Sequence, residues 1–426
     1  MVRALTIIML LMSFSSVGMA ASPAVRVLTV DGPINPVTAD YLRNNLHAAA
    51  LNRESLVLIE MDTPGGLDAA MRDIVKEELA SPVPVAVFVT PSGARAASAG
   101  AVIGLAADVL AMSPGTNIGA AHPVSIGETP DKVMQEKLEN DAEAYLEGIA
   151  RKRGRNSELA RSMVRQSISL SAEKALDARI IDLLAADRSE LLHKLDGRII
   201  QRDGGQIALR LGGAEVKTVG MSGRQRILNT ISNPNVAYVL MMLGFLGLFF
   251  ELSNPGVILP GVVGGISLLL SFYAFQTLPV NYAGVLLIVF ALILFIAEIK
   301  IVSHGMLAVG GIISMVLGSL LLFESTEPYL RLSWEVIITT VLATSLFFLV
   351  AVTKAVQVHR RKPVTGAEGL VGESGRAETD LAPEGKVFVR GEYWDAVSDE
   401  RVAAGEKVMV VAVEGMRVRV RKASPG

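Results

Sequence analysis

The sequence predicts three structural regions: an α/β domain with a mostly parallel sheet, a polytopic α-helical membrane region, and a small all-β barrel. Three patterns carry this prediction. Short β-branched runs alternate with helical patterns, five apolar segments follow, and strand signals punctuated by glycine close the chain. With 426 residues, 51% of them hydrophobic, the chain is too long for one compact domain and more apolar than a typical soluble protein.

The first region, residues 21–225, reads as an α/β domain. Apolar runs end in turns rich in glycine or proline, and amphipathic helical patterns separate them. The runs are 25–30, 56–61 and 84–89, and the helical patterns include 38–51 and 67–79. Short apolar strands that alternate with helices are typical of a parallel sheet covered on both faces. Functional sites in such folds lie at the C-terminal ends of the strands, where two glycine-containing turns occur here.

Residues 1–20 predict a signal peptide. Arg3 provides a basic start, an apolar stretch runs over 5–14, and small residues stand at the expected cleavage site near Ala20. The alternative is an uncleaved anchor, but so short an apolar run spans a bilayer poorly. Under either interpretation, the domain that follows is exported.

The membrane region, 236–356, contains five apolar segments. They are 236–250, 256–275, 282–297, 306–323 and 336–352. An odd number of spans places the two ends on opposite sides. The basic cluster at 359–362 and Lys300 are both predicted to be cytoplasmic by the positive-inside rule. The sequence therefore predicts a multi-pass protein of a bacterial inner membrane, with a periplasmic N-terminal domain and a cytoplasmic C-terminus.

Two local features qualify this membrane region. Its first two segments are interrupted by prolines and glycines, so they are also compatible with a re-entrant hairpin. Gly261 and Gly265 form a pair of small residues four apart, a spacing that predicts close packing between helices.

The C-terminal region, 366–424, predicts a small barrel. Short strand signals at 387–389, 408–413 and 418–420 are separated by glycines. Such barrels often bind nucleic acids by stacking bases on aromatic side chains along a basic groove. This region has only three aromatic residues and mixed charges, and the whole chain has a formal net charge of −2. We therefore expect no nucleic-acid partner.

The segment from Pro91 to Gly100 carries the most chemistry. Ser98 stands among alanines and glycines just after a predicted strand, where small neighbours let a substrate backbone approach. Free N–H groups at the start of a helix favour developing negative charge, as a nucleophile beside an oxyanion hole requires. Gly65, Gly66 and Ala99 are the candidate oxyanion donors. The alternative is a small residue in a tight contact between helix and sheet.

A nucleophilic serine needs a base, and the sequence offers two kinds. The chain has no cysteine, and of its five histidines only His122 follows a glycine-rich approach to a possible site. A lysine serves if burial lowers its pKa toward neutrality. The predicted helix 130–153 offers Lys132, Lys137 and Lys152. Of these, Lys137 lies on the flank of the apolar stripe formed by Met134, Leu138, Ala142, Tyr145 and Ile149.

Several motifs resemble those of a known superfamily. Residues 62–66, 93–100 and 113–120 are similar to the signal-peptide-peptidase A and ClpP superfamily, which has a crotonase-like α/β fold. Together with 251–256, 298–305 and the order of the regions, the whole chain resembles the long form of the NfeD family. The resemblance implies a crotonase/ClpP-like exported domain and an OB-like barrel at the C-terminus.

The resemblance also implies a function. It implies a membrane-bound serine protease with a Ser-Lys dyad, in which Ser98 is the nucleophile and Gly65 or Gly66, with Ala99, forms the oxyanion hole. No metal or organic cofactor is implied. The implied partner is a stomatin-like or other SPFH-domain membrane protein whose hydrophobic segments are cleaved, and self-association is expected. The serine–lysine spacing of the family favours Lys137, whereas an alignment anchored on 154–156 places that lysine at Glu147.

Two rival functions remain open. The domain could be a non-catalytic scaffold that binds an SPFH protein, in which case Ser98 is structural. Acyl-CoA chemistry on the same fold is the third class, and export argues against it because CoA is cytosolic. Loss of activity on Ser98→Ala substitution separates the protease from the scaffold.

Overall fold

A computed structural model describes residues 23–124, 131–253, 256–301, 303–323, 325, 328–359 and 369–423. Two compact units are distinguished, Met1–Leu294 with Val309–Ala343, and Phe295–Ala308 with Thr344–Gly426. The predicted signal peptide lies outside the described residues, as do the basic residues 360–362.

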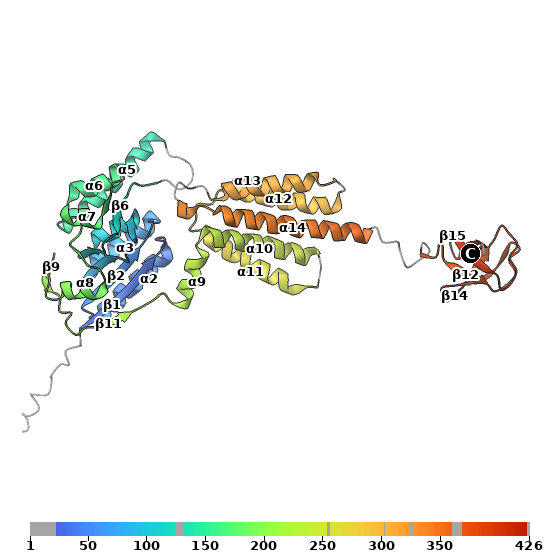
Figure 1. Cartoon of the computed structure of the whole chain (residues 1–426), viewed down its shortest axis with the longest axis horizontal. Coiled ribbons are helices and arrows are strands. Elements are labelled where there is room, and N and C mark those ends of the chain that lie inside the picture. The colour runs from blue at the N-terminus through green and yellow to red at the C-terminus, as the bar shows by residue number, and fades with distance from the viewer. Residues whose placement is uncertain are drawn as a thin grey trace, which may run out of the picture. The chain divides into compact units, whose positions relative to one another are not determined.

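The N-terminal domain is built on a six-stranded sheet in the order β11-β1-β2-β3-β5-β8, and all its pairings are parallel (Figure 1). Its strands are β1 (Ala24–Asp31), β2 (Leu56–Asp62), β3 (Val85–Val89), β5 (Val109–Met112), β8 (Leu183–Leu184) and β11 (Glu215–Thr218). The predicted α/β class with a mostly parallel sheet is confirmed. The three predicted strand runs match β1, β2 and β3 to within one residue at each end.

Alternating side chains of these strands enter two separate hydrophobic cores. On β2, Val57, Ile59 and Met61 belong to one core, while Leu56 and Leu58 belong to the other. A strand with both faces covered gains stability from every side chain, which explains the unbroken apolar runs in the sequence. Neither face of the sheet is left to solvent at its centre.

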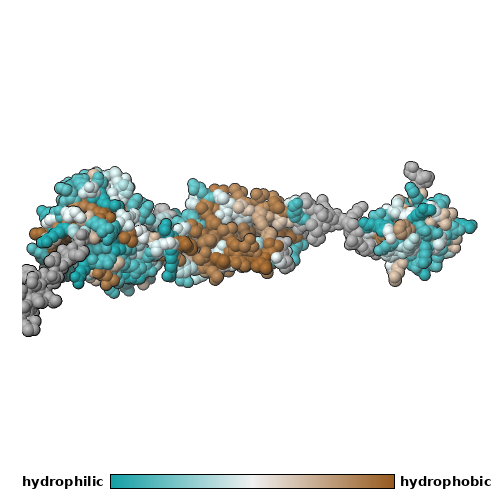
Figure 2. Space-filling view, turned by 90° about the horizontal axis from the view of Figure 1, so that it is seen from below, coloured by the Kyte–Doolittle hydropathy of each residue, from teal (hydrophilic) through white to brown (hydrophobic). Residues whose placement is uncertain are grey.

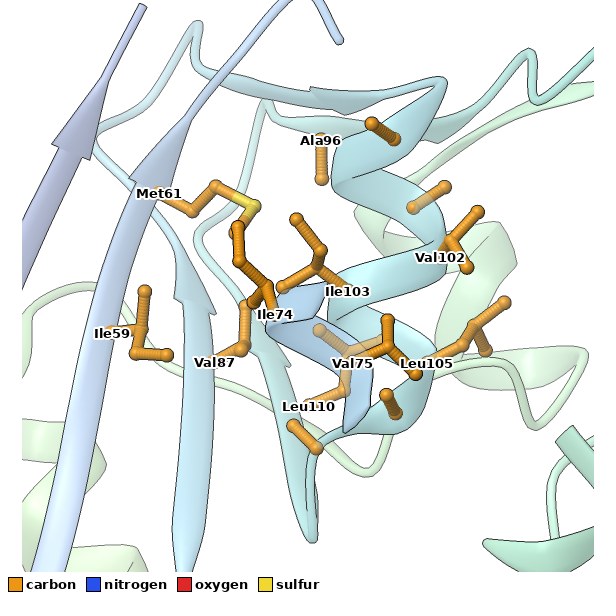
Figure 3. Close-up of a cluster of buried hydrophobic side chains, with 14 of the residues drawn as sticks. Ile59, Met61, Ile74, Val75, Val87, Ala96, Val102, Ile103, Leu105 and Leu110 are labelled. Carbon is orange, nitrogen blue, oxygen red and sulfur yellow. The ribbon is translucent and has the colours of Figure 1, made fainter. Parts of the chain in front are cut away.

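Most of the helices of this domain cover one face of the sheet, and α8 packs on the other. The helices are α2 (Pro36–Leu51), α3 (Asp68–Ala80), α4 (Ala99–Ala106), α5 (Lys132–Lys152), α6 (Ser157–Arg165), α7 (Ala172–Asp177) and α8 (Arg188–Leu195). Figure 3 shows Val102, Ile103 and Leu105 of α4 packed with Ile74 and Val75 of α3 against the sheet. All eight residues of α4 are buried, so this helix is a rigid support for the residue that precedes it.

A smaller sheet of three strands lies beside the main one, in the order β4-β6-β7. Its strands are β4 (Arg95–Ala97), β6 (Asn117–Gly119) and β7 (Ser169–Ser171), and β9 (Ile199–Arg202) and β10 (Gly205–Ala208) form a separate hairpin. β4 and β6 run parallel, with Ala97 opposite Gly119. The small sheet therefore places the residue after β4 next to the residues after β6.

Five apolar helices follow the short helix α9 (Gly223–Ile231). They are α10 (Pro234–Ser253), α11 (Ile258–Phe275), α12 (Tyr282–Lys300), α13 (Met306–Leu322) and α14 (Trp334–His359), with a 3-10 turn at Pro328–Leu330. Among the described residues, four are long and apolar enough to cross a membrane, and α13 is shorter. Figure 2 shows that hydrophobic residues make up most of the visible surface of this region, which suits contact with lipid. The chain is a membrane protein.

Close packing between α10 and α11 involves Gly261 of the predicted pair, where an added Cβ would lie 2.8 Å from Cγ of Glu251 on α10, and two further glycines. A Cβ on Gly264 would lie 2.9 Å from the carbonyl oxygen of Gly244, and one on Gly247 would lie 2.6 Å from that of Pro260. By contrast, a Cβ on Gly265 would meet open space. The prediction for Gly265 is wrong, because the rotation of α11 directs the neighbouring Gly264 at α10.

The C-terminal region is a closed barrel of five strands in the order β12-β13-β14-β16-β15. The strands are β12 (Ser374–Ala377), β13 (Glu384–Val389), β14 (Glu392–Val397), β15 (Lys407–Glu414) and β16 (Arg417–Lys422). Alternating residues of β13, β15 and β16 fill its interior, among them Val387, Val389, Val408, Val410, Val418 and Val420. The predicted small all-β barrel is confirmed.

Candidate active site

Ser98 occupies a strained turn between β4 and α4. Its backbone angles are φ 51° and ψ −117°, and its side chain makes no capping hydrogen bond to the helix it precedes. A non-glycine residue at positive φ costs free energy, and such strain is concentrated at functional sites. Its amide donates to the carbonyl oxygen of Gly119 over 2.9 Å, and its own carbonyl accepts from Ala101 N–H at 3.0 Å. The backbone is thus fixed on both sides while the hydroxyl is not used for capping.

The first turn of α4 provides one candidate oxyanion donor. Ala99 is the first helical residue, so its N–H has no acceptor within the helix. The helix dipole places a partial positive charge at the start of α4, where this N–H group lies. Ala99 therefore combines the adjacency to Ser98 and the unused donor that an oxyanion hole needs.

The turn after β2 provides the other candidate donors. The N–H of Gly65 donates to the hydroxyl of Thr63 at 3.1 Å, and its carbonyl accepts from Ile34 at 2.8 Å. Gly66 forms a parallel bridge with Ile34, and in such a bridge its own N–H points away from the partner strand. Of the two glycines, Gly66 therefore keeps its N–H available.

Ser98, Ala99 and Gly66 line one cavity of about 220 Å³, which is also bordered by Tyr329 and Leu330 of the 3-10 turn. Its apolar wall comes from α3, α4, α5 and α6, through Met71, Val102, Leu138, Ala142, Tyr145 and Val164. Asp68, Arg72 and Asp141 supply its charges. Arg72 pairs with Asp68 at 2.9 Å and Asp141 at 2.5 Å, and lies 4.4 Å from the centre of the Tyr145 ring. A cavity with this lining suits an apolar side chain of a peptide.

The structure does not bring Lys137 into this cavity. Helix α5 presents Leu138, Asp141 and Tyr145 to it, whereas Lys137 is exposed. The stripe predicted on α5 is buried only in its C-terminal half, since Met134 is 48% and Leu138 42% exposed. The expectation of a desolvated cleft around Lys137 is therefore not met here, and its role as the base stays a prediction.

The other lysines and the alternative position are also accounted for. Lys132 is the first residue of α5 and is exposed, and Lys152 pairs with Asp203. Glu147 pairs with Arg151 and lies 3.6 Å from Arg161. None of these three residues lines the cavity among its described residues.

His122 is the one histidine among the residues that line the cavity with Ser98. Its Nδ1 lies 3.0 Å from the carbonyl oxygen of Val164, and its Nε2 lies 3.6 Å from Oε1 of Glu139. The sequence had singled out His122 but gave no sign of Glu139. A contact between a loop residue and a helix 17 positions later depends on tertiary packing, so no local pattern could have predicted it.

Three family models together match nearly the whole chain. The NfeD1b N-terminal domain matches residues 24–218, the NfeD integral membrane domain matches 235–354, and the NfeD-like C-terminal, partner-binding domain matches 367–422. Membrane-bound protease PH1510 of Pyrococcus horikoshii is 35% identical over 99% of both chains. The chain belongs to the NfeD family. The resemblance to the NfeD family found in its motifs is confirmed.

A second relative and a solved structure are also similar to this NfeD chain. Membrane protein NfeD1b of Bacillus subtilis is 27% identical over 95% of this chain and 94% of its own length. A solved structure is named 1510-N membrane-bound stomatin-specific protease, a lysine-to-alanine mutant in complex with a substrate peptide. It is 33% identical over 50% of this chain and 98% of its own, with a TM-score of 0.46.

Within the described residues of the NfeD chain, no group of three or more His, Asp or Glu side chains is placed to hold a metal ion. The residues that line the cavity with Ser98 offer a hydroxyl, an imidazole, backbone amides and paired charges. That set is sufficient for nucleophilic acyl transfer.

Proposed function

We propose that this NfeD chain is a membrane-anchored serine endopeptidase with Ser98 as the nucleophile. The observation that carries the proposal is the strained backbone of Ser98, which begins a buried helix and faces an apolar cavity. The hydroxyl attacks a peptide carbonyl carbon, and the N–H groups of Ala99 and Gly66 bind the oxygen that becomes negative. Gly65 shapes the turn that presents Gly66. Such donors typically contribute about 10² to 10³ in kcat each.

The substrate class follows from the cavity and the relatives. The proposed substrate is an apolar segment of a stomatin-like or other SPFH-domain membrane protein, since the cavity is mainly apolar and a relative is named a stomatin-specific protease. A common membrane holds enzyme and substrate at high effective concentration. The C-terminal barrel, which matches a partner-binding domain, is the proposed contact for the same partner.

We place the protease domain on the periplasmic side of a bacterial inner membrane and the barrel in the cytoplasm. In this proposal all five apolar helices are spans, including the shorter α13, and this odd number together with the positive-inside rule supports the arrangement. Self-association of the chain is part of the proposal. Cysteine labelling of intact cells at positions in each domain tests the sidedness, and sedimentation in detergent tests the oligomer.

The activity is tested with the full chain in detergent micelles. The wild type and Ser98→Ala are incubated with labelled casein and with a peptide from the apolar C-terminal segment of an SPFH protein. Cleavage by the wild type that is lost in Ser98→Ala supports the protease. If both proteins fold and neither cleaves, the scaffold function is favoured. The exposure of Lys137 makes the scaffold the main rival to the protease.

A further inference from the structure

We propose that a second cavity, next to the Ser98 cavity, is a substrate-binding subsite that the membrane region helps to build. It would hold the part of the substrate chain on the membrane side of the cleaved bond. This inference rests on the proposed protease function and adds a binding site to it. The second cavity has a volume of about 340 Å³ and adjoins the Ser98 cavity, because Gly66, Tyr329 and Leu330 line both.

The walls of the second cavity come from both the N-terminal domain and the membrane region. The N-terminal domain contributes residues 33–35 and 66–67. The membrane region contributes the start of α10, the connection after α11 and the 3-10 turn before α14, through Val236, Leu278 and Leu330. All these residues belong to one compact unit. Because apolar helices begin or end at these points, the cavity lies where a substrate segment leaves the bilayer.

Hydrogen bonds hold the segments around the second cavity together. Nδ2 of Asn35, in the N-terminal domain, donates to Oδ1 of Asn229 on α9 at 2.7 Å. The N–H of Ser333, three residues after Leu330, donates to Oδ1 of Asn235 on α10 at 2.9 Å. Leu330 itself is only 7% exposed. The turn that borders both cavities is therefore fixed to α10 and packed in place.

The lining of the second cavity is neutral. None of the described residues that line it is charged, whereas Asp68, Arg72 and Asp141 line the Ser98 cavity. A buried or half-buried ion needs a countercharge or several hydrogen bonds. A neutral lining therefore favours an uncharged segment over an ion or a phosphate group.

Two asparagines of the lining keep a hydrogen-bond donor for such a segment. The N–H of Thr38 donates to Oδ1 of Asn35, so Asn35 must donate to Asn229 through Nδ2. Asn229 accepts through its own Oδ1, and its Nδ2 has no partner among the described residues. Oδ1 of Asn233 likewise accepts from the N–H of Asn235 at 2.9 Å, so its Nδ2 is also available. Both amide nitrogens can donate to carbonyl oxygens of a bound peptide.

The chemistry of the second cavity matches a polypeptide better than a lipid. Ile34, Leu67, Val236 and Leu278 provide an apolar surface for the side chain of a hydrophobic residue. The available amide donors suit the backbone carbonyls on either side of that residue. The acyl chain of a lipid would use the apolar surface but neither donor. The occupant we assign is therefore the apolar membrane-side segment of the substrate.

Val236→Trp tests the subsite by filling it. The full chain in detergent is assayed with a peptide from the apolar C-terminal segment of an SPFH protein. We expect KM to rise about tenfold with kcat little changed, as loss of uniform binding predicts. Phosphonylation of Ser98 by a small fluorophosphonate probe should keep its wild-type rate, because the probe needs only the Ser98 cavity. Leu252→Trp is the matched control, since Leu252 is exposed at the other end of α10, and it should change neither value.

Asn229→Asp tests the donor without filling the cavity. The carboxylate still accepts from Asn35 but cannot donate to a peptide carbonyl. We expect KM for the same peptide to rise about fivefold, again with the wild-type rate of Ser98 labelling. Asn44→Asp is the matched control, because Asn44 is an exposed asparagine on α2 outside the lining of the second cavity.

Shortened peptides show whether the substrate itself occupies the second cavity. The cleaved bond is located by mass spectrometry, and the peptide is then shortened from each end in turn. We expect one of the two truncations to raise KM for the wild type and to remove the difference between the wild type and Val236→Trp. Such a loss of additivity is the signature of two groups in contact.

The outcomes separate this inference from the function on which it rests. If folded Val236→Trp and Asn229→Asp cleave the peptide with the wild-type KM, the subsite is overturned and the protease stands. If Val236→Trp raises KM equally for the full and both shortened peptides, the cavity holds a lipid or detergent molecule, and the subsite is again overturned. If the folded wild type is neither labelled at Ser98 nor active, the protease proposal fails and the subsite fails with it.

Discussion

Gly65 lies directly against the side chain of Ser98. A Cβ added to Gly65 would stand 2.8 Å from Cβ of Ser98 and 3.2 Å from its hydroxyl oxygen. The φ angle of Gly65 is +119°, a conformation that residues with a side chain rarely adopt. A glycine is thus needed at position 65 for two reasons, its backbone conformation and the space that the side chain of Ser98 occupies.

Gly65→Ala should abolish most of the activity. The added methyl group displaces the Ser98 side chain, and we expect kcat to fall by about 10² or more, since displacements of about 1 Å cost that much. The measurement is cleavage of casein by the full chain. Gly32→Ala is the matched control, because Gly32 has φ +107° and open space around its Cβ position. Both variants should lose about 1–3 kcal/mol of stability from backbone strain, but full activity in Gly65→Ala would refute the close contact.

The buried carboxyl group of Glu78 on α3 should make the stability of the protein depend on pH. It is fully buried, and within the described residues neither of its carboxylate oxygens accepts a hydrogen bond. Burial raises the pKa of Glu78 well above its ordinary value of 4.5, with Arg153 opposing and Asp108 reinforcing the shift. The folded state therefore holds this proton to higher pH than the unfolded chain does. The contribution of Glu78 to stability is full below 4.5 and is lost as the pH rises through the raised pKa.

Glu78→Gln should remove this pH dependence. Relative to the wild type, the variant should become more stable as the pH rises from 5 to 8, by about 1.4 kcal/mol for each unit by which the pKa of Glu78 is raised. Its unfolding temperature should rise accordingly. Thermal unfolding of the full chain in detergent, followed at several pH values, measures this. The exposed Asp73→Asn on the same helix is the control and should show the wild-type slope. Parallel curves for the wild type and Glu78→Gln would contradict the prediction.

Gly264 and Gly265 provide a matched pair in the membrane region. A Cβ on Gly264 would lie 2.9 Å from Gly244 O and from Leu248 N, so Gly264→Ala must separate α10 from α11. We expect a loss of about 1–3 kcal/mol in stability. Gly265→Ala meets open space and gains helix propensity, so it should stabilise by up to about 1 kcal/mol. The unfolding temperatures of the two variants in detergent should move in opposite directions, and equal shifts would exclude the packing described here.

The fold could be predicted largely from the sequence because its signals are local. Strands β1, β2 and β3 are unbroken apolar runs, and burial of both sheet faces explains why no alternation is seen. The apolar helices and the alternating valines of the barrel strands are likewise local patterns in the sequence. Helix α9 was missed, since only Ile231 of its nine residues is buried and its pattern is weak.

The candidate site could be predicted only in part. Ser98 and the two glycine-containing turns could be singled out because they follow predicted strands and consist of small residues. The proposed base was harder to predict. A periodic apolar stripe indicates which face of a helix is buried, but not how far along the helix the burial extends. On α5 burial begins near Ala142, which leaves Lys137 in solvent. The proximity of Glu139 to His122 depends on how α5 lies across the domain, and no spacing in the sequence encodes this.

Arg155 fixes the far end of α4, the helix that follows Ser98. It is buried, and its guanidinium donates to Leu105 O at 2.6 Å, to Ala107 O at 3.0 Å and to Asp182 at 2.8 Å. Leu105 is in the last turn of α4 and Ala107 is its C-cap, so neither carbonyl has an intrahelical donor. Arg155 thus satisfies the C-terminal end of α4 and couples it to the buried edge of the main sheet.

Arg155→Met should therefore destabilise the protein strongly. It leaves two carbonyls without their side-chain donor and removes one partner of Asp182, which keeps the N–H of Leu110 and an ion pair with Arg198. Removal of one partner of a buried ion pair costs about 3–5 kcal/mol. Arg155→Lys keeps the charge but not the planar fork, so it should recover less than half of this loss. Arg151→Met is the control, because Arg151 is exposed and its replacement should change stability by less than about 0.5 kcal/mol. The readout is thermal unfolding of the full chain, and similar unfolding temperatures for Arg155→Met and Arg151→Met would show that α4 is held by its apolar packing alone.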